Sequence, residues 1–477
     1  MRIIRVLLVV VGTAILGLWL AWRPQKDNPN SLIQLRGFVR LINRVSKIYE
    51  AVLGQPLFRL DPATFEPQIM AFKIAEHEVY GSPNTPSEIH GLQALFRGLE
   101  APDSILSPVG KILTKREIKN RLQHRQQVLD YARQHPEVLQ EPIRRPLIIS
   151  GFPRSGSSFL QRLLATDPNA RSPFLWEMRT DPAPKPPTKA DIDSMSDPRI
   201  ALVQKGFDSI AKVSPDYLDV VNRYHETSPT NIDEEVQLLR DCTWNNIGGT
   251  YVGEDESYRQ WILNEAEDKT YMYRYLKAWL QIMSSTYAPA SHWVLKTPTH
   301  AYFLSALCQE FADANLIFTH RDPRSVVASA CKLNLVANAF RIDFDKLDSQ
   351  RHGQRVLHFL KTAGELVLQF HNQNSDMAQR AMHIMYEDLT ADPIGTIEQI
   401  YDHFGYQMTD EFRANMQDYL SQNRQHKHGK PRYSLEEFGL DNAAVDKAFE
   451  AYNQTFRNPN QVLTNGTGTK VRAQRSF

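Results

Sequence analysis

Short apolar runs, each followed by a helical pattern, recur along the chain from residue 146 onward. The first is 147–150, which ends at a glycine, and similar runs follow at 293–296, 316–319 and 382–386. Turn residues and then apolar side chains at helical spacing come after each run. Unbroken apolar runs of this length are typical of strands buried on both faces of a parallel sheet. Their alternation with helices predicts an α/β fold.

The expected architecture is a P-loop-like three-layer fold, in which flanking helices cover both faces of a central parallel sheet. Residues 25–144 carry helix-like apolar spacing and predict a helical N-terminal region. Residues 145–457 would form the α/β domain, with a long, mostly helical insertion between its first and second strands. The last segment, 458–477, has basic residues but no acids, and we expect a flexible tail there.

The N-terminal residues 1–24 differ from the rest, because residues 6–22 form an apolar run without a charged side chain. As a helix this run would span roughly 26 Å, just short of a typical hydrocarbon core. Trp19 and Trp22 lie near its end, where aromatic residues collect at a membrane interface. A cleaved signal peptide is the alternative, but no small-x-small cleavage site follows the run. We therefore expect a single-pass transmembrane helix and a membrane localisation, with the side of the membrane left open.

Charge and cysteine content exclude some classes of protein and some kinds of site. The chain has 55 basic and 54 acidic residues among its 477, and its net charge is +1. Nucleic-acid-binding proteins usually show a basic excess, so the composition argues against this class. The three cysteines, Cys242, Cys308 and Cys331, form no CxxC pair. The sequence therefore indicates neither a metal site nor a disulfide framework.

A glycine-bracketed loop, Gly-Phe-Pro-Arg-Ser-Gly-Ser-Ser at 151–158, comes directly after the first predicted strand and opens a helix. Backbone N–H groups of such a turn and the positive end of the helix suit a phosphate. The spacing is close to that of a P-loop, but Ser157 stands where that motif has its lysine, and the basic residue is Arg154. A kinase or nucleotide triphosphatase needs the missing lysine, so this loop argues against those classes.

A second strand-to-helix turn lies at 316–329. Asp322 is a suitable helix N-cap and Pro323 a suitable first helical residue. Arg321 therefore falls at the end of a strand, where ligands bind in open α/β sheets, and Ser329 lies two turns into the helix. Two such turns in this order indicate a ligand-binding site in an α/β sheet more strongly than either turn alone.

The loop at 151–160 and the turn at 316–329 resemble the donor-binding motifs of PAPS-dependent sulfotransferases. The Pro-Arg-Ser-Gly version of the loop is similar to that of tyrosylprotein sulfotransferases and their bacterial relatives. The resemblance implies transfer of a sulfuryl group from PAPS to a hydroxyl or amine, with PAP released and no metal required. It assigns the donor to the loop residues Arg154, Ser155, Gly156, Ser157 and Ser158, to Arg321 and Ser329 at the 3′-phosphate, to Tyr386, and to Lys430 and Arg432 of a late basic loop.

Sulfuryl transfer also needs cations at the leaving phosphate and a base at the acceptor. Arg154 and Lys296, which follows the second predicted strand, are the expected cations. The resemblance makes Glu177 the expected base, since relatives carry a glutamate in a comparable position. Its neighbours Trp176 and Met178 would partly desolvate it and raise its pKa. His225 and His300 are the reserve candidates.

Two other readings stay open at this stage: a P-loop-like kinase and a catalytically inactive membrane scaffold of the same fold. The missing P-loop lysine argues against the first. The presence of Arg154, Lys296, Arg321 and Ser329 argues against the second. The acceptor is not specified by the sequence, and glycans, lipids, sterols and proteins all remain candidates.

Overall fold

Within the described part of the chain, five parallel strands form the central sheet. The computed structural model describes residue 23 and residues 25–26, 31–243, 257–264, 266–423 and 433–457. The strands are β1 (Leu147–Gly151), β2 (Ala170–Arg171), β3 (His292–Lys296), β4 (Asn315–His320) and β5 (Met382–Met385). Their spatial order is β2-β3-β1-β4-β5, and every pairing is parallel. The predicted α/β fold with a central parallel sheet is therefore confirmed.

The four predicted strands are β1, β3, β4 and β5, whereas the short edge strand β2 has no apolar run that could reveal it. Strand β1 lies at the middle of the sheet, with β3 on one side and β4 on the other. The order of the strands reverses at this position. In open α/β sheets the carboxyl ends of the strands beside such a reversal form the ligand-binding crevice. The two loops that the sequence singled out follow β1 and β4, and so they meet there.

Alternate side chains of the strands face two helical layers. In β1, Leu147 and Ile149 pack in one hydrophobic cluster, and Ile148 packs in another on the opposite face. The first layer contains α6 (Ser157–Leu164), α18 (Pro393–Phe404) and α19 (Asp410–Gln422). The second contains α12 (Thr270–Ser284), α13 (Leu304–Glu310), α14 (Pro323–Asn338) and α15 (Ser349–His371). This gives the three layers expected from the sequence.

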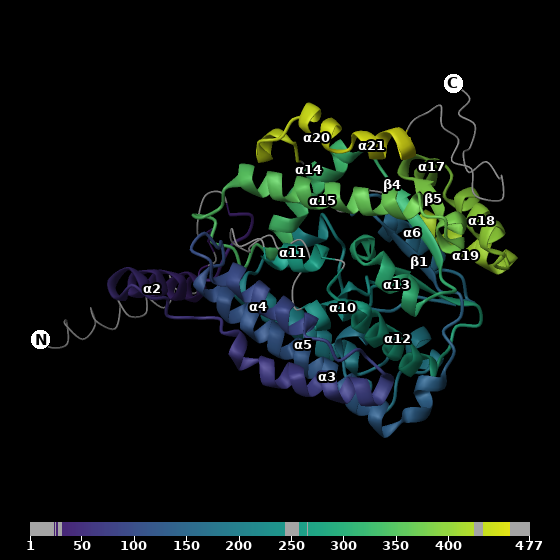
Figure 1. Cartoon of the computed structure of the whole chain (residues 1–477), viewed down its shortest axis with the longest axis horizontal. Coiled ribbons are helices and arrows are strands. Elements are labelled where there is room, and N and C mark those ends of the chain that lie inside the picture. The colour runs from purple at the N-terminus through teal and green to yellow at the C-terminus, as the bar shows by residue number, and fades with distance from the viewer. Residues whose placement is uncertain are drawn as a thin grey trace, which may run out of the picture.

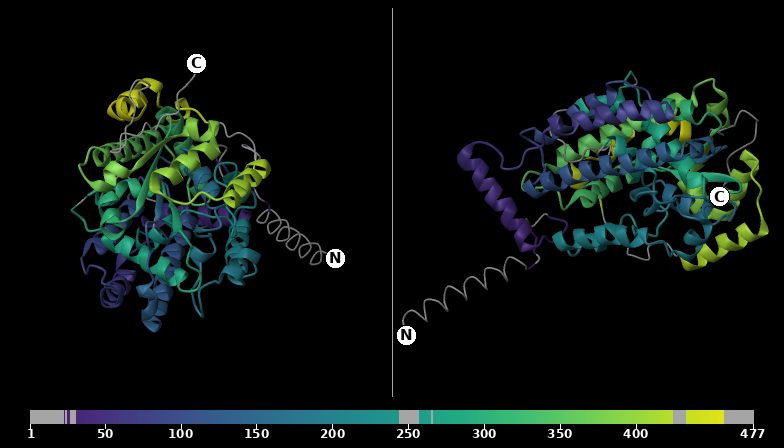
Figure 2. Two further views of the ribbon diagram at one scale, coloured as in Figure 1. Left: turned by 90° about the vertical axis from the view of Figure 1, so that its right-hand side faces the viewer. Right: turned by 90° about the horizontal axis from the view of Figure 1, so that it is seen from below.

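The N-terminal region consists of helices that share the larger core. They are α2 (Gly37–Leu53), α3 (Glu66–Tyr80), α4 (Ser87–Glu100) and α5 (Pro108–Gln134). Leu95 and Leu122 from this region pack in the same cluster as Trp279 of α12. Figure 1 shows α3, α4 and α5 on the side of the molecule opposite α14 and α15, and Figure 2 shows α2 at the end of the molecule nearest the N-terminus.

The insertion between β2 and β3 is helical, as its spacing predicted. It contains α7 (Lys189–Ser194), α8 (Arg199–Val213), α9 (Tyr217–Asn222), α10 (Val236–Thr243), α11 (Ser257–Leu263) and α12. The remaining helices are α16 (Asp376–Arg380), α17 (Tyr386–Ala391), α20 (Asn442–Ala448) and α21 (Glu450–Tyr452). The insertion matters for function because α8, α9 and α10 contribute walls to the cavity described below.

The prediction of an N-terminal transmembrane helix is contradicted by the described helices. Of the helices in the described ranges, none combines the length and the apolar character needed to cross a membrane. The run at 6–22 itself lies outside the described residues, as does the expected tail at 458–477. We therefore do not retain the single-pass anchor or the membrane localisation that was inferred from this run.

Candidate functional site

The loop between β1 and α6 is shaped by backbone conformations that L side chains rarely adopt. Gly151 has φ +113°, and a Cβ on it would lie 2.4 Å from the carbonyl oxygen of Thr319 in the neighbouring strand β4. Gly156 has φ +86° at the N-cap of α6, where a Cβ would lie 2.9 Å from the ring of Tyr386. Arg154, between them, also has a positive φ of 66°. The loop thus turns tightly at the carboxyl edge of the sheet, with the start of α6 facing the crevice.

The two predicted donor motifs are in direct contact. Arg154 Nε donates a hydrogen bond to Ser329 Oγ of α14 at 3.1 Å, and Arg321 Nη1 donates to the carbonyl oxygen of Arg154 at 2.8 Å. The Arg321 guanidinium lies 4.1 Å from the centroid of the Tyr386 ring. Ser155 Oγ lies 2.6 Å from Thr319 Oγ1 and ties the loop to the end of β4. Arg154 and Arg321, which are far apart in the sequence, therefore form one cationic cluster.

The electrostatics of this cationic cluster favour an anionic ligand. Burial lowers the pKa of the Arg154 guanidinium below its usual value, and the neighbouring charge of Arg321 acts in the same direction. A bound anion would relieve both effects, because it would pair with two adjacent guanidiniums. The loop also leads into the N-terminus of α6, as a phosphate-binding turn does.

Lys296, at the end of β3, faces the same loop from the opposite side. Its side chain is almost fully buried, and its Nζ donates a hydrogen bond to Ser158 Oγ at 2.9 Å. Nζ also forms an ion pair with Glu234, whose second carboxylate oxygen accepts a hydrogen bond from Thr297 Oγ1 at 3.3 Å. Lys296 is thus held at the loop by a hydroxyl and a carboxylate.

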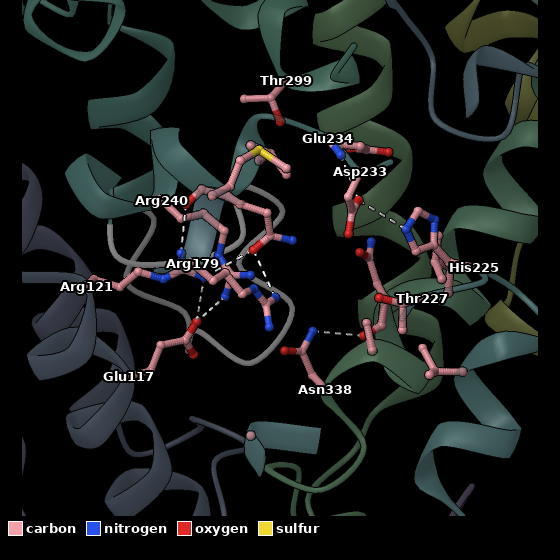
Figure 3. A pocket seen from close by; sticks show the side chains of 18 of the residues that line it. Glu117, Arg121, Arg179, His225, Thr227, Asp233, Glu234, Arg240, Thr299 and Asn338 are labelled. Carbon is pink, nitrogen blue, oxygen red and sulfur yellow. Dashed lines mark hydrogen bonds and ion pairs between the residues drawn. The ribbon is translucent and has the colours of Figure 1, made fainter. Parts of the chain in front are cut away.

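A cavity of about 860 Å³ opens from this loop and extends under the helical insertion. Gly151, Arg154, Ser157 and Ser158 line the end of the cavity at this loop, and α8 and α9 contribute an apolar wall. Figure 3 shows His225, Asp233 and Glu234 on one side of the cavity and a cluster of arginines on the other. Its size lies within the usual range of small-molecule sites, roughly 300–1,000 Å³.

The structure does not bring Glu177 to this cavity. Glu177 is buried in the short 3-10 helix η3 (Glu177–Arg179), where its Oε1 pairs with Arg171 Nη2 at 2.5 Å. Its Oε2 accepts a hydrogen bond from the backbone N–H of Phe174 at 2.9 Å. Both oxygens are therefore engaged inside the protein, and we no longer assign the base to this residue.

The two reserve histidines differ sharply. His300 is fully buried, with Nδ1 2.8 Å from the Tyr273 hydroxyl and Nε2 2.5 Å from Glu235 Oε1, so both ring nitrogens are occupied. His225 lines the cavity, and its Nε2 lies 3.5 Å from Asp233 Oδ1. Burial alone would raise the pKa of Asp233, but the interaction with His225 holds it below its usual value.

The sequence alone does not place Asp233 and Glu234 in the site, because consecutive acidic residues before an apolar helix are typical of a helix N-terminus. Three consecutive carboxylates just before an apolar helix were the available signal, but it did not identify their partners. Lys430 and Arg432 lie outside the described residues, and their expected role stays a prediction. Tyr386 lies beside the loop, as its contacts with Arg321 and Gly156 show.

Comparisons with known proteins agree with this geometry. Residues 146–410 match the family model described as the sulfotransferase family. The crystal structure of sulfotransferase STF9 from Mycobacterium avium superposes with a TM-score of 0.67 and 27% identity, covering 81% of this chain and 95% of that one. Sulfotransferase STF1 from Mycobacterium tuberculosis H37Rv shares the fold, with a TM-score of 0.63 and 23% identity over 80% of this chain and 98% of that one.

A curated relative matches over a shorter stretch. It is the omega-hydroxy-beta-dihydromenaquinone-9 sulfotransferase Stf3 of Mycobacterium bovis, which is 25% identical over 152 residues. The match covers 30% of this chain and spans only about a third, 36%, of the relative's length.

Proposed function

This chain belongs to the sulfotransferase family, and from that premise we propose that it transfers a sulfuryl group from PAPS to a hydroxyl of an acceptor bound in the cavity. The predicted membership of the sulfotransferase family is thereby confirmed, whereas the role of the two motifs, the donor itself and the roles of single residues are part of the proposal. One observation carries it: Arg154 of the first motif donates to Ser329 of the second, and Arg321 donates back to Arg154.

The donor would be held by the loop after β1 and by the turn after β4. In this proposal the backbone of residues 151–158 and Arg154 contact the 5′ phosphosulfate, and Arg321 and Ser329 contact the 3′-phosphate. The positive φ values of Gly151 and Gly156 support this assignment, because they let the loop turn tightly against Thr319 and Tyr386, where a side chain would not fit. Bound PAPS supplies the activated sulfuryl group, and the protein supplies the charges around it.

During transfer the acceptor oxygen forms a bond to sulfur while the bond from sulfur to the PAP phosphate breaks, and the leaving phosphate takes the electron pair. Arg154 and Lys296 would stabilise the negative charge that builds on that phosphate. His225 would accept the proton of the acceptor hydroxyl, and Asp233 would stabilise the resulting imidazolium. Glu234 would hold Lys296 in position until the donor binds.

The acceptor end of the cavity suggests an apolar molecule that carries a hydroxyl. The apolar wall from α8 and α9, which includes Val203, Phe207 and Ile210, supports this class. The mycobacterial relative acts on a menaquinone derivative, as its name states, and so it gives independent support for an apolar acceptor.

A thermal-shift comparison tests the donor assignment. A ligand that binds only the folded protein stabilises it in proportion to the logarithm of its concentration over its Kd. We expect PAP to raise Tm without added metal and in the presence of EDTA, whereas ATP with Mg²⁺ should have little effect. Stabilisation by ATP–Mg²⁺ but not by PAP would overturn the sulfotransferase assignment and favour the kinase alternative.

A further inference from the structure

Four arginines gather at the part of the cavity that lies across from His225. They are Arg121, Arg179, Arg240 and Arg341 (Figure 3 labels the first three). A single carboxylate, Glu117, forms ion pairs with three of them, at 3.5 Å to Arg121, at 2.5 Å to Arg341 and also to Arg240. These guanidiniums lower the pKa of Glu117 although its burial alone would raise it. Positive charge therefore dominates this part of the cavity wall.

Arg179 differs from its three neighbours because no carboxylate in the described ranges forms an ion pair with it. Its Nη2 donates to Gln237 Oε1 at 3.0 Å, and that neutral oxygen also accepts from Arg121 at 3.3 Å. Arg179 is exposed, and its side chain lines the cavity. Desolvation by the surrounding protein atoms and the charges of Arg121 and Arg240 lower the pKa of Arg179 to about 10. A guanidinium that is surrounded by like charges is stabilised by an anion.

The carboxylates that line the cavity already have other partners. Glu117 is shared among three arginines, Asp233 pairs with His225, and Glu234 pairs with Lys296. Asp241 accepts from Arg121 at 3.2 Å and lies 2.7 Å from His124 Nδ1, and Asp181 accepts from the backbone of Ala183 at 2.8 Å. None of these five carboxylates forms an ion pair with Arg179, which leaves that charge for a ligand.

We propose that Arg179 binds an anionic group, a carboxylate or a phosphate, carried by the acceptor. This inference rests on the proposed function and specifies its substrate class. The acceptor would place its hydroxyl at His225, its apolar part along the wall formed by Phe207 and Ile210, and its anion at Arg179. A planar guanidinium suits both anions, since it offers paired N–H donors.

The test uses the dead-end complex with PAP, so that binding is measured without turnover. Titration calorimetry would compare ω-hydroxy carboxylates of increasing length with α,ω-diols of the same lengths, and ω-hydroxyalkyl phosphates with both. We expect the best anionic probe to bind at least about tenfold more tightly than its matched diol, as a charge-assisted hydrogen bond predicts. In Arg179→Gln this preference should disappear, while the affinity for the diols stays within about twofold.

Two further variants separate charge from structure. Arg179→Lys keeps the charge and should retain part of the preference, whereas Arg413→Gln, at an exposed ion pair on α19, should retain all of it. If PAP does not stabilise the wild-type protein, the proposed function fails. If PAP does stabilise it but anions and diols bind equally, or no anionic probe binds, the donor assignment stands and the inference about Arg179 is overturned. Whichever probe binds more tightly, the carboxylate or the phosphate, identifies the anionic group of the acceptor.

Discussion

Lys296 Nζ donates to Ser158 Oγ at 2.9 Å, and this contact joins the end of β3 to the loop that follows β1. The two elements are separated by 138 residues in sequence and are brought together because β1 and β3 are neighbours in the sheet. In the proposed reaction the same ammonium group lies beside the leaving phosphate. Its role and that of the loop can therefore be tested together.

Lys296→Met should lower turnover by about 10²- to 10³-fold, the range for losing one preorganised charge at a transition state. The variant also leaves Glu234 without its partner, which can cost about 3–5 kcal/mol of stability for a buried pair. The double variant Lys296→Met with Glu234→Gln removes both charges, and it should recover stability in urea unfolding without recovering turnover. Recovery of activity in the double variant would show that Lys296 has only a structural role.

Arg321→Ala should lower the affinity for PAP by about 10- to 100-fold, as expected for a lost charge-assisted contact. Adenosine 5′-phosphosulfate lacks the 3′-phosphate, and its affinity should change far less. Arg324→Ala is the matched control, because Arg324 lies three residues on and pairs with Asp446 at the surface. Equal losses for both nucleotides would remove Arg321 from the 3′-phosphate.

Acid should destabilise the protein through a histidine in α15. Burial lowers the pKa of His352 to about 4, and its Nε2 lies 2.9 Å from the carbonyl oxygen of Cys331. Between pH 6.5 and 4 the unfolded chain binds a proton that the folded chain does not, so stability falls as pH falls, by up to about 1.4 kcal/mol per pH unit.

His352→Gln keeps a donor toward Cys331 and should make the plot of unfolding free energy against pH shallower in that window. His358→Gln, at an exposed position of the same helix, should leave the plot unchanged. A slope that is identical in wild type and His352→Gln would exclude this residue as the cause.

The two motifs of the proposed donor site could be located from sequence because their residues lie within short strand-to-helix turns. The spacing inside 151–158 and 316–329 fixes where Arg154, Arg321 and Ser329 lie relative to their own strands, and a parallel sheet brings such ends together. The contacts between the end of β3 and the acidic segment 233–235 could not be predicted in this way. Lys296 meets Glu234 across 62 residues and His300 meets Glu235 across 65, and these pairings depend on how the insertion packs.

The partner of Glu177 also could not be predicted from the local sequence. Glu177 has the spacing and the apolar neighbours of a perturbed carboxylate, but Arg171, six residues earlier, turns back and neutralises it inside the protein. Local sequence gave no sign of this, because an arginine at that separation pairs with the glutamate only when the connecting segment folds back on itself. Apolar neighbours indicate burial, but they do not indicate which charge accompanies it.

Variants of Glu177 and His225 should have opposite effects on stability and turnover. Glu177→Gln leaves Arg171 buried without its carboxylate, and this should cost about 3–5 kcal/mol of stability. Arg171 would keep its contacts with the rings of Tyr287 and Trp293, each 4.6 Å away, and so the fold should survive. The folded fraction should then bind PAP normally and retain most of its turnover, because Glu177 does not reach the cavity.

His225→Asn should behave in the opposite way. His225 is partly exposed, and Asn can still donate a hydrogen bond to the buried Asp233, so the loss of stability should be smaller than in Glu177→Gln. Turnover should fall by about 10²-fold or more, as expected for losing a general base, with PAP affinity unchanged. The acidic limb of the pH–rate profile should also disappear, since that limb reports protonation of the base. If His225→Asn stays active while Glu234→Gln is inactive and binds PAP, the proton goes to Glu234, and the carboxylate that holds Lys296 in the free enzyme is also the base.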